Sequence, residues 1–203
     1  MKSSVIVTGA SSGIGAEIAR QFSKENYFVF LCGRNEEKLK SVQKTCVNNT
    51  AIMAFDLKNL KEYEPCFHEQ LKSAPPLEIL VNNAGIYHLE SFSETADQIW
   101  LDQFNVNLLA PVQLVKLVWP LFVKNRKGSI LNISSTLGIK PIPNTSAYSA
   151  MKAAMNNWTI ALAQEGGPYN IRANSICPGI VDTPIHSFHN LDTKEKKIKS
   201  QIL

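Results

Sequence analysis

The amino-acid sequence predicts an α/β fold in which helices cover both faces of a parallel sheet, a doubly wound, three-layer α/β/α arrangement. Short runs rich in apolar and β-branched residues alternate with longer helical patterns from the first residues onward. These short runs are mostly unbroken apolar stretches, as expected for strands that are buried on both faces of a parallel sheet. No Gly/Ser-rich linker, repeat or low-complexity tract divides the chain, so we expect one domain over residues 1–203.

Six strands with covering helices are expected. The strands are placed at residues 4–8, 28–32, 51–55, 79–82, 129–134 and 172–177. The helices are placed at residues 14–26, 36–45, 60–73, 94–124 in two pieces, and 146–164. Gly166, Gly167 and Pro168 mark a stop after the last of these helices. In a sheet of this kind ligands bind beyond the carboxyl ends of the strands.

Composition excludes several classes of protein. The chain has 203 residues, of which 44% are apolar and 19% charged, which is typical of a globular domain that needs no disulfide or structural metal. The net charge is +4, but residues 194–199 alone contribute +3, so we do not expect nucleic-acid binding. The longest apolar stretch, residues 108–123, is broken by two prolines, a glutamine and a lysine, so no membrane span is expected.

Cysteine usage predicts a reducing environment. The four cysteines have no C-x-x-C spacing and lie in separate apolar contexts, so we expect buried free thiols. No His/Cys pattern typical of a metal site occurs, and no metal is expected. The N-terminus lacks a recognisable targeting segment, and the expected location is the cytoplasm. The cysteines are Cys32, Cys46, Cys66 and Cys177.

A glycine-rich loop follows the first expected strand and leads directly into a helix. Residues 8–15 read Thr-Gly-Ala-Ser-Ser-Gly-Ile-Gly. Glycines let the backbone turn tightly and approach a phosphate, and the N-terminus of the following helix adds N–H donors and a partial positive charge. The loop is therefore a candidate phosphate-binding site, although a tight strand-to-helix turn would use the same glycines.

Arg34 indicates which dinucleotide such a loop would hold. It lies 19 residues after Gly15, at the end of the second expected strand. At about this distance an acidic residue binds the ribose 2′-hydroxyl of NAD, whereas an arginine suits the 2′-phosphate of NADP. The acidic residue is absent, which favours NADP over NAD. The alternative is that Arg34 only caps a surface turn.

The loop spacing T-G-x-x-x-G-x-G resembles that of the short-chain dehydrogenases/reductases, a family of Rossmann-like NAD(P)-dependent oxidoreductases. Further motifs of the family follow along nearly the whole chain. Asp56 and Leu57 resemble its adenine contact, residues 82–85 resemble its N-N-A-G turn, and residues 178–183 resemble its P-G loop at the nicotinamide. The cofactor contacts that the resemblance and the loop imply are Gly9, Ser11, Ser12, Gly13, Ile14, Gly15, Arg34, Asp56, Leu57, Asn83, Ala84, Gly85, Tyr148, Lys152, Pro178, Gly179, Val181 and Thr183.

Four residues form the expected reacting group. Tyr148 and Lys152 are four residues apart near the start of a helix and therefore share one face, although alone they would be an ordinary exposed aromatic beside a surface lysine. Ser134 and Ser135 stand at the end of the fifth expected strand, and Ser135 is 13 residues before Tyr148, which is the serine-to-tyrosine interval of the family. Asn107 matches the fourth catalytic position of the family.

The chemistry of this group follows from charge. Hydride addition to a carbonyl produces an alkoxide that an acid must protonate. A cation at about 4 Å lowers the pKa of a tyrosine, ordinarily ~10, by at most ~3 units, which would bring Tyr148 near 7. We therefore expect Tyr148 to be the general acid in reduction and base in oxidation, activated by Lys152, with Ser135 orienting the substrate oxygen. The resemblance implies that Lys152 also bonds the nicotinamide ribose and that Asn107 holds a water linking Lys152 to solvent.

These residues predict an NADP(H)-dependent oxidoreductase that acts on a carbonyl or secondary alcohol of a small molecule. The alternative is a catalytically silent NADP(H)-binding sensor or scaffold, which would not need Asn107, Ser135, Tyr148 and Lys152 together. The segment after the N-N-A-G turn, Tyr87 and His88, either lines the substrate crevice or packs in the core or rim.

The resemblance also sets expectations for assembly and for the end of the chain. It implies a homodimer or homotetramer packed through the helices near residues 108–124 and 146–164. Residues 183–203 correspond to the start of the family's substrate lid, which a further helix and a seventh strand follow, so we expect a C-terminally truncated domain.

Overall fold

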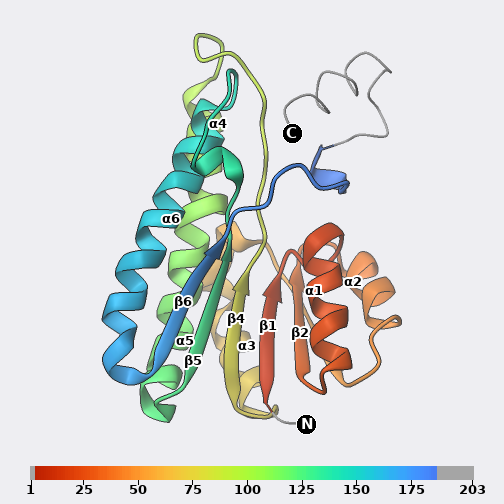
Figure 1. Ribbon diagram of the computed structural model, residues 1–203. Coiled ribbons are helices and arrows are strands. Elements are labelled where there is room, and N and C mark those ends of the chain that lie inside the picture. Colours follow the sequence, from red (N-terminus) through yellow and green to blue (C-terminus); the bar gives the residue numbers. More distant parts are fainter. Residues whose placement is uncertain (1–2, 187–203) are drawn as a thin grey trace.

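Six parallel strands form one sheet in the computed structural model, which describes residues 3–186 (Figure 1). The spatial order is β3-β2-β1-β4-β5-β6, so the direction of strand addition reverses between β1 and β4. All six expected strands are present, with bounds within two residues of those predicted. The strands are β1 (Ser4–Thr8), β2 (Phe28–Gly33), β3 (Thr50–Ala54), β4 (Leu77–Asn82), β5 (Gly128–Ile133) and β6 (Ile171–Ile176).

The helices connect successive strands, and short helical turns follow several of the strands. The α-helices are α1 (Gly13–Lys24), α2 (Glu36–Gln43), α3 (Leu60–Lys72), α4 (Asp97–Phe104), α5 (Ala110–Asn125) and α6 (Ser146–Gly166). The short turns are η1 (Leu57–Asn59), the π-helical η2 (Asn105–Leu109), η3 (Thr136–Gly138), η4 (Gly167–Tyr169) and η5 (Pro184–His186).

The helical region expected at residues 94–124 in two pieces differs from the prediction. It begins at Asp97, after a turn in which Ser91 O accepts hydrogen bonds from the N–H groups of Glu94 and Thr95. From Asp97 it continues to Asn125 without a break, because the π-helical turn η2 joins α4 to α5. A π-helical turn accommodates an extra residue inside a continuous helix, which a search for breaks in helical periodicity cannot detect.

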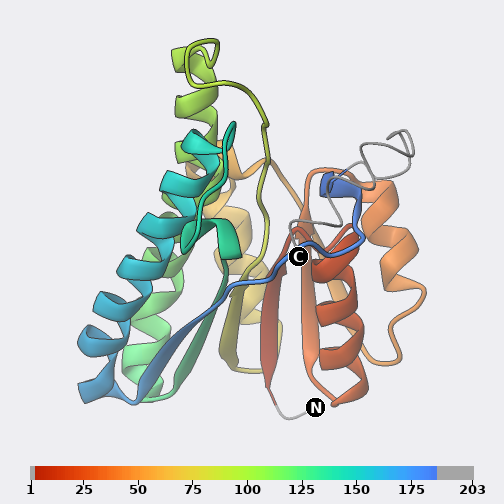
Figure 2. The same cartoon turned by 45° about the horizontal axis from the view of Figure 1, so that its top comes forward.

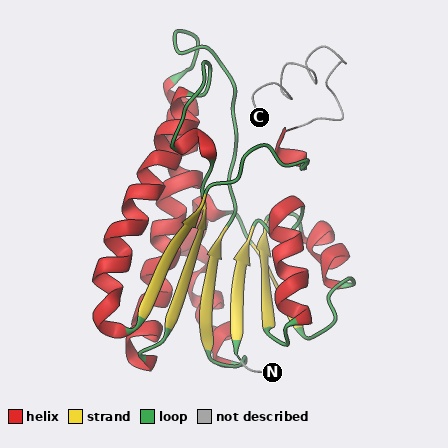
Figure 3. Ribbon diagram, viewed as in Figure 1, coloured by secondary structure: helices red, strands yellow, loops and turns green. Residues whose placement is uncertain are grey.

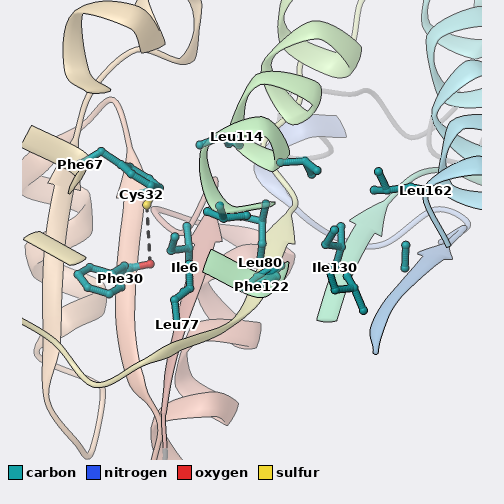
Figure 4. Close-up of a cluster of buried hydrophobic side chains, with 14 of the residues drawn as sticks. Ile6, Phe30, Cys32, Phe67, Leu77, Leu80, Leu114, Phe122, Ile130 and Leu162 are labelled. Carbon is teal, nitrogen blue, oxygen red and sulfur yellow. Dashed lines mark hydrogen bonds between the residues drawn. The ribbon is translucent and has the colours of Figure 1, made fainter. Parts of the chain in front are cut away.

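The two faces of the sheet bury separate hydrophobic clusters. One cluster contains Ile6, Phe30 and Leu80 of the strands, packed against Phe67 of α3 and Phe122 of α5, and Figure 4 shows it in close-up. On the other face the strand residues between these positions pack against α1 and α2. Successive side chains along each strand therefore pack into the two clusters in turn, as the unbroken apolar runs predict. Figure 3 shows the strands between the two layers of helices.

The second face is covered unevenly. The described helices that pack on it, α1 and α2, lie over β1, β2 and β3, whereas Figures 1 and 2 show β5 and β6 without a helix in front. Ile176 of β6 is 49% exposed. It borders, with Leu131 of β5, an open groove of about 760 Å³ beside α1. Within residues 3–186, helices therefore cover this end of the sheet on one of its two faces.

The expectation of four buried thiols is wrong for three of them. Cys32 of β2 is buried in the core, but Cys46 and Cys177 are half-buried and Cys66 is exposed. Cys46 lies in the loop that follows α2, and Cys66 lies on a side of α3 that meets solvent, so apolar neighbours in the sequence do not bury them. All four thiols are free. The basic run at 194–199 and the lid region beyond residue 186 lie outside the described residues.

The helix from Asp97 to Asn125 is long and apolar enough to cross a membrane, with a mean hydropathy of 1.6 in its most apolar window. Within the protein 44% of that window is buried against other elements. The core helices of soluble proteins meet the same criterion, so the feature is weak evidence for a membrane span.

Candidate active site

The loop after β1 is tied to the turn after β4, the two elements between which the strand order reverses. The Thr8 hydroxyl donates to Val81 O at 3.2 Å and accepts from the backbone N–H groups of Asn83 and Ala84, each at 3.0 Å. The Asn83 side chain donates to Thr8 O at 2.9 Å. Thr8 was not expected to matter beyond its place in the loop motif, and it holds two motifs of the site together.

This close approach requires glycine. Gly9 has a φ of +65°, and a Cβ there would lie 2.8 Å from Asn83 Nδ2. A Cβ on Gly15 would clash with Asn83 Nδ2 and with the backbone of Gly9. Ser12, the N-cap of α1, makes no side-chain capping hydrogen bond, so its hydroxyl does not block the first turn. The loop thus presents helix N–H groups to an incoming anion, which fits a cofactor phosphate.

A cavity of about 550 Å³ lies at the carboxyl ends of the strands. This volume falls in the range of roughly 300–1,000 Å³ typical of ligand sites. Gly15 and Asn107 do not line it; Gly15 supports the loop from behind and Asn107 is fully buried. The expected site residues that line it are Gly9, Ser11, Ser12, Gly13, Ile14, Arg34, Asp56, Leu57, Asn83, Ala84, Gly85, Ser135, Tyr148, Lys152, Pro178, Gly179, Val181 and Thr183.

One end of the cavity carries exposed charges at its rim. It is here called the adenosine end, because Arg34 and Asp56, expected from the sequence to lie near an adenosine, are found there. Arg34 lies 4.0 Å from Asp56, and the Asp56 carboxylate accepts a hydrogen bond from the backbone N–H of Lys58 at 3.0 Å. Lys58 Nζ in turn donates to the Asp102 carboxylate at 2.6 Å, which holds the pKa of Asp102 below its ordinary value. Lys58 and Asp102 were missed by the sequence analysis because they are 44 residues apart and belong to no motif.

The opposite end contains buried polar groups. It is here called the catalytic end, because the residues expected from the sequence to react, Ser135, Tyr148 and Lys152, line it. Tyr148 is 8% exposed and Lys152 is 3% exposed, so neither is the surface residue that an isolated motif would suggest. Lys152 Nζ donates to Ile133 O at 2.8 Å and lies 5.6 Å from the centre of the Tyr148 ring. Ser135 hydrogen-bonds the Tyr148 phenol and caps η3 by accepting from Leu137 N at 3.1 Å.

Burial, rather than the nearby ammonium, dominates the ionisation of this pair. Burial raises the pKa of Tyr148 to about 12, against a smaller lowering from the Ser135 hydrogen bond and a raising from Tyr87. Burial also lowers the pKa of Lys152 to about 8. The expected lowering of the Tyr148 pKa toward 7 is therefore wrong for this structure, since removal of both groups from water disfavours their charged forms.

Asn107 lies on the π-helical turn η2 and binds backbone rather than facing the cavity. Its side chain accepts from Ile86 N and donates to Ile86 O, each at 2.9 Å, and it also contacts the Gln103 side chain. A Cβ on Gly85 would lie 2.9 Å from Asn107 Oδ1 and 3.8 Å from Lys152 Nζ, so Asn107 and Lys152 flank the same glycine. Asn107 thereby fixes the chain that follows the N-N-A-G turn.

The P-G loop closes back over the glycine loop. Pro178 O accepts from Thr136 N at 2.9 Å, and the Thr183 hydroxyl donates to Val181 O at 3.3 Å. A Cβ on Gly13 would lie 3.0 Å from Thr183 Cγ2, so the two loops are in contact.

Tyr87 and His88 lie outside the lining of this cavity and make contacts of their own. The Tyr87 ring packs edge-to-face on the Tyr148 ring, with centroids 5.0 Å apart. His88 Nε2 lies 3.0 Å from Glu90 Oε2 on the surface. Neither residue lines the cavity.

A model of the short-chain dehydrogenase family matches residues 3–194. The chain belongs to this family. Among relatives, it is 35% identical over 194 residues to an L-xylulose reductase of Caenorhabditis elegans, covering 95% of this chain and 77% of that protein. It is 34% identical over 188 residues to dehydrogenase/reductase SDR family member 7B of Xenopus laevis. That match covers 88% of this chain but only 58% of the frog protein, less than two thirds of its length.

Solved structures of short-chain dehydrogenases have the same fold. An actinorhodin polyketide ketoreductase variant with NADPH superposes with a TM-score of 0.87 at 34% identity, covering 96% of this chain and 80% of that one. A metagenomic short-chain oxidoreductase in complex with NADP superposes with a TM-score of 0.83 at 31% identity, covering 88% of this chain and 82% of that one. The expected doubly wound, Rossmann-like sheet is confirmed.

Proposed function

We propose that the chain is an NADP(H)-dependent oxidoreductase that interconverts a carbonyl and a secondary alcohol of a small molecule. The observation that carries this proposal is the shared cavity. A glycine loop at the N-terminus of α1 lines it together with Ser135, Tyr148 and Lys152. A silent sensor would need the loop but not the buried serine, tyrosine and lysine.

Two observations support NADP rather than NAD as the cofactor. Arg34, 70% exposed in its side chain, stands at the cavity wall where the 2′-phosphate would lie, and no acidic residue occupies its position. The ketoreductase and the metagenomic oxidoreductase described above are complexes with NADPH and NADP. Gly9, Gly13 and the first turn of α1 would hold the pyrophosphate, and Lys152, Val181 and Thr183 would lie at the nicotinamide.

When bound, NADPH supplies the hydride, so that carbonyl, NADPH and one proton give alcohol and NADP⁺. The chain's own residues position the carbonyl and manage this proton. With a pKa of about 12, the Tyr148 phenol remains protonated at neutral pH and donates its proton to the oxygen as negative charge develops there. Ser135, which already hydrogen-bonds Tyr148, donates to the same oxygen and orients it.

Lys152 stabilises the tyrosinate that remains after proton transfer. Its pKa of about 8 leaves it mostly protonated at neutral pH, close to the Tyr148 ring. A proton would return to Tyr148 from the side of Asn107 through Lys152, because Asn107 and Lys152 flank the same glycine, Gly85. Burial of Tyr148 and Lys152 favours reduction of the carbonyl. The protonated phenol of Tyr148 can act as the general acid at neutral pH, whereas the tyrosinate that oxidation needs as the general base is disfavoured.

The test is to measure NADPH and NADH oxidation by the purified chain with a panel of aldehydes and ketones, and to identify the alcohol product. We expect turnover with NADPH at a kcat/KM well above that with NADH. Binding of NADPH without turnover of any carbonyl would favour the sensor, and equal use of NADH would remove the role of Arg34.

We also propose that the protein is cytoplasmic and that it forms a homodimer or homotetramer. The four free thiols support the cytoplasm. Exposed apolar side chains on the helices, Leu101 and Phe104 on α4 and Ile160 on α6, support a homodimer or homotetramer.

A further inference from the structure

The charges that line the cavity are separated from its catalytic end. Among the described lining residues, Arg34, Asp56, Lys58 and Asp102 all lie at the adenosine end. The only other charged one is Lys152, whose Nζ is buried and donates to Ile133 O. A charged substrate would therefore meet no exposed counter-charge near Tyr148 within residues 3–186.

The wall around the reacting hydroxyls is apolar instead. Ile86 follows the N-N-A-G turn, Leu137 follows Ser135, and both line the cavity. Val181 and Ile185 add further apolar lining to the cavity, from the loop that contacts Gly13. Removing such surface from water is favourable only if an apolar part of the substrate covers it.

Leu137 connects this wall to a second groove of about 670 Å³. The groove lies between the segment at 137–144 and the first turns of α6, and the loop at 86–92 contributes Phe92 to it. Figures 1 and 2 show the two loops side by side above the sheet. Glu90 N donates to Asn144 O at 3.0 Å and holds the two loops together.

The surface of this groove is apolar and exposed. Phe92 is 75% exposed and Ile139 is 70% exposed. The rest of the lining is mostly apolar and comes from the second loop and the first turns of α6: Leu137, Gly138, Pro141, Ile142, Pro143, Ala150 and Ala153, with the polar Asn144, Ser146 and Ser149. His88 and Glu90 contact each other at 3.0 Å, and neither lines either cavity. Lys140 is exposed and also outside both linings. The apolar path thus runs from Tyr148 across Leu137 to Phe92.

We propose that the substrates are uncharged carbonyl compounds whose elongated apolar body runs from the catalytic end across Leu137 into this groove. The inference rests on the proposed oxidoreductase function and adds the substrate class to it. Polyhydroxylated sugars and carboxylates would leave polar groups against an apolar wall and are excluded on the same ground.

The first experiment measures kcat/KM with NADPH for methyl ketones from butanone to decanone. We expect kcat/KM to rise by up to about fourfold for each methylene that enters the groove, the factor for burying one CH₂. A long keto acid and its methyl ester form a matched pair, in which the ester should be much the better substrate. A polyhydroxylated ketose should be turned over poorly.

The second experiment places a charge in the groove. Ile139→Lys should flatten the chain-length series and improve the keto acid relative to its ester, and Leu137→Arg should do so more strongly. The matched control is Val47→Lys, because Val47 is 71% exposed but lines neither cavity. Val47→Lys should leave the whole series unchanged, and Ile139→Lys, at an equally exposed position, should fold as well as the control does.

A flat chain-length series in the wild-type protein, with the keto acid turned over as fast as its ester, would overturn the substrate class while leaving the oxidoreductase intact. Equal effects of Ile139→Lys and Val47→Lys would also overturn it. Absence of NADPH oxidation with every carbonyl would instead contradict the proposed function itself.

Discussion

The polar and charged side chains at the two ends of the cavity differ in their exposure to water. At the adenosine end, Arg34 is 70% exposed in its side chain, and Lys58 and Asp102 are 39% and 30% exposed, so their charges are paired but remain in water. At the catalytic end, Tyr148 and Lys152 are almost fully buried and their pKa values move away from the ordinary ones. Water screens the first set and is excluded from the second.

This contrast separates binding from chemistry. Exposed charges interact weakly one by one, so under the proposed function we expect cofactor affinity to come mainly from the glycine loop and the helix N-terminus, and selectivity from the rim. Buried groups interact strongly with each other and with a reacting atom, but burial costs free energy that the rest of the fold must supply. Substitutions at the catalytic end should therefore have large effects and substitutions at the rim small ones.

The largest effect is expected at Tyr148. Tyr148→Phe removes the proton donor but keeps the ring that packs on Tyr87, so kcat should fall by about 10²–10⁴-fold, the usual contribution of a general acid. The dissociation constant for NADPH, measured by fluorescence titration, should change little. Tyr169→Phe, at a 38% exposed tyrosine after α6, is the matched control and should keep full turnover. If the Tyr148→Phe enzyme retained most of its kcat, the buried end of the cavity would be no more sensitive to substitution than the exposed rim, contrary to our expectation.

Lys152 should make stability depend on pH. Its pKa is lowered to about 8 in the folded chain from 10.5, so between these values the unfolded chain binds more protons. Stability therefore rises with pH across this window, by about 3 kcal/mol if Lys152 acts alone, and is constant for this group below about pH 8. Urea denaturation at about pH 7.5 and about pH 9.5 should show the rise in the wild type and its loss in Lys152→Met. An equal rise in both proteins would assign it to other groups.

Arg34 should have an intermediate and selective effect. Arg34→Leu removes the cation at the wall where the 2′-phosphate would lie, and we expect NADPH affinity to fall about tenfold because the side chain is exposed and screened. NADH affinity should stay the same or rise. Equal loss for both cofactors would mean that Arg34 supports the loop through Asp56 rather than reading the phosphate.

The smallest effect is expected for the pair that closes the adenosine end. Lys58→Met breaks the contact with Asp102 and should weaken NADPH binding by less than about threefold, with a loss that shrinks at high salt. Lys127→Met is the control, because Lys127 pairs with Glu78 at 2.9 Å away from the cavity and should not affect binding. If Lys58→Met weakened NADPH binding by more than about tenfold, the Lys58–Asp102 pair would contribute as strongly as a buried group, contrary to what we expect of an exposed ion pair.

The parts of the fold and the site that depend on short stretches of sequence could be located without the structure. The glycine loop, the N-N-A-G turn and the P-G loop follow strands whose apolar runs are easy to recognise, and their positions in the structure agree with the prediction. Tyr148 and Lys152 share a helix face because of their spacing alone.

The features that were missed depend on packing between distant segments. Lys58 and Asp102 meet only because η1 packs against η2, the turn that directly follows α4. The pKa of Tyr148 was expected from one charge at an assumed distance, whereas desolvation by the whole surroundings decides it. Cys66 was expected to be buried because its neighbours are apolar, but burial depends on which side of α3 faces solvent.

The π-helical turn at Asn105–Leu109 makes this part of the chain intolerant of changes in length. Removing one residue there would restore a regular α-helix and turn everything before it by about 100° relative to α5. Asp102 would leave the cavity rim, and Asn107 could no longer bind the backbone of Ile86. An insertion or deletion that a surface loop would absorb without loss would here damage cofactor and substrate positions together.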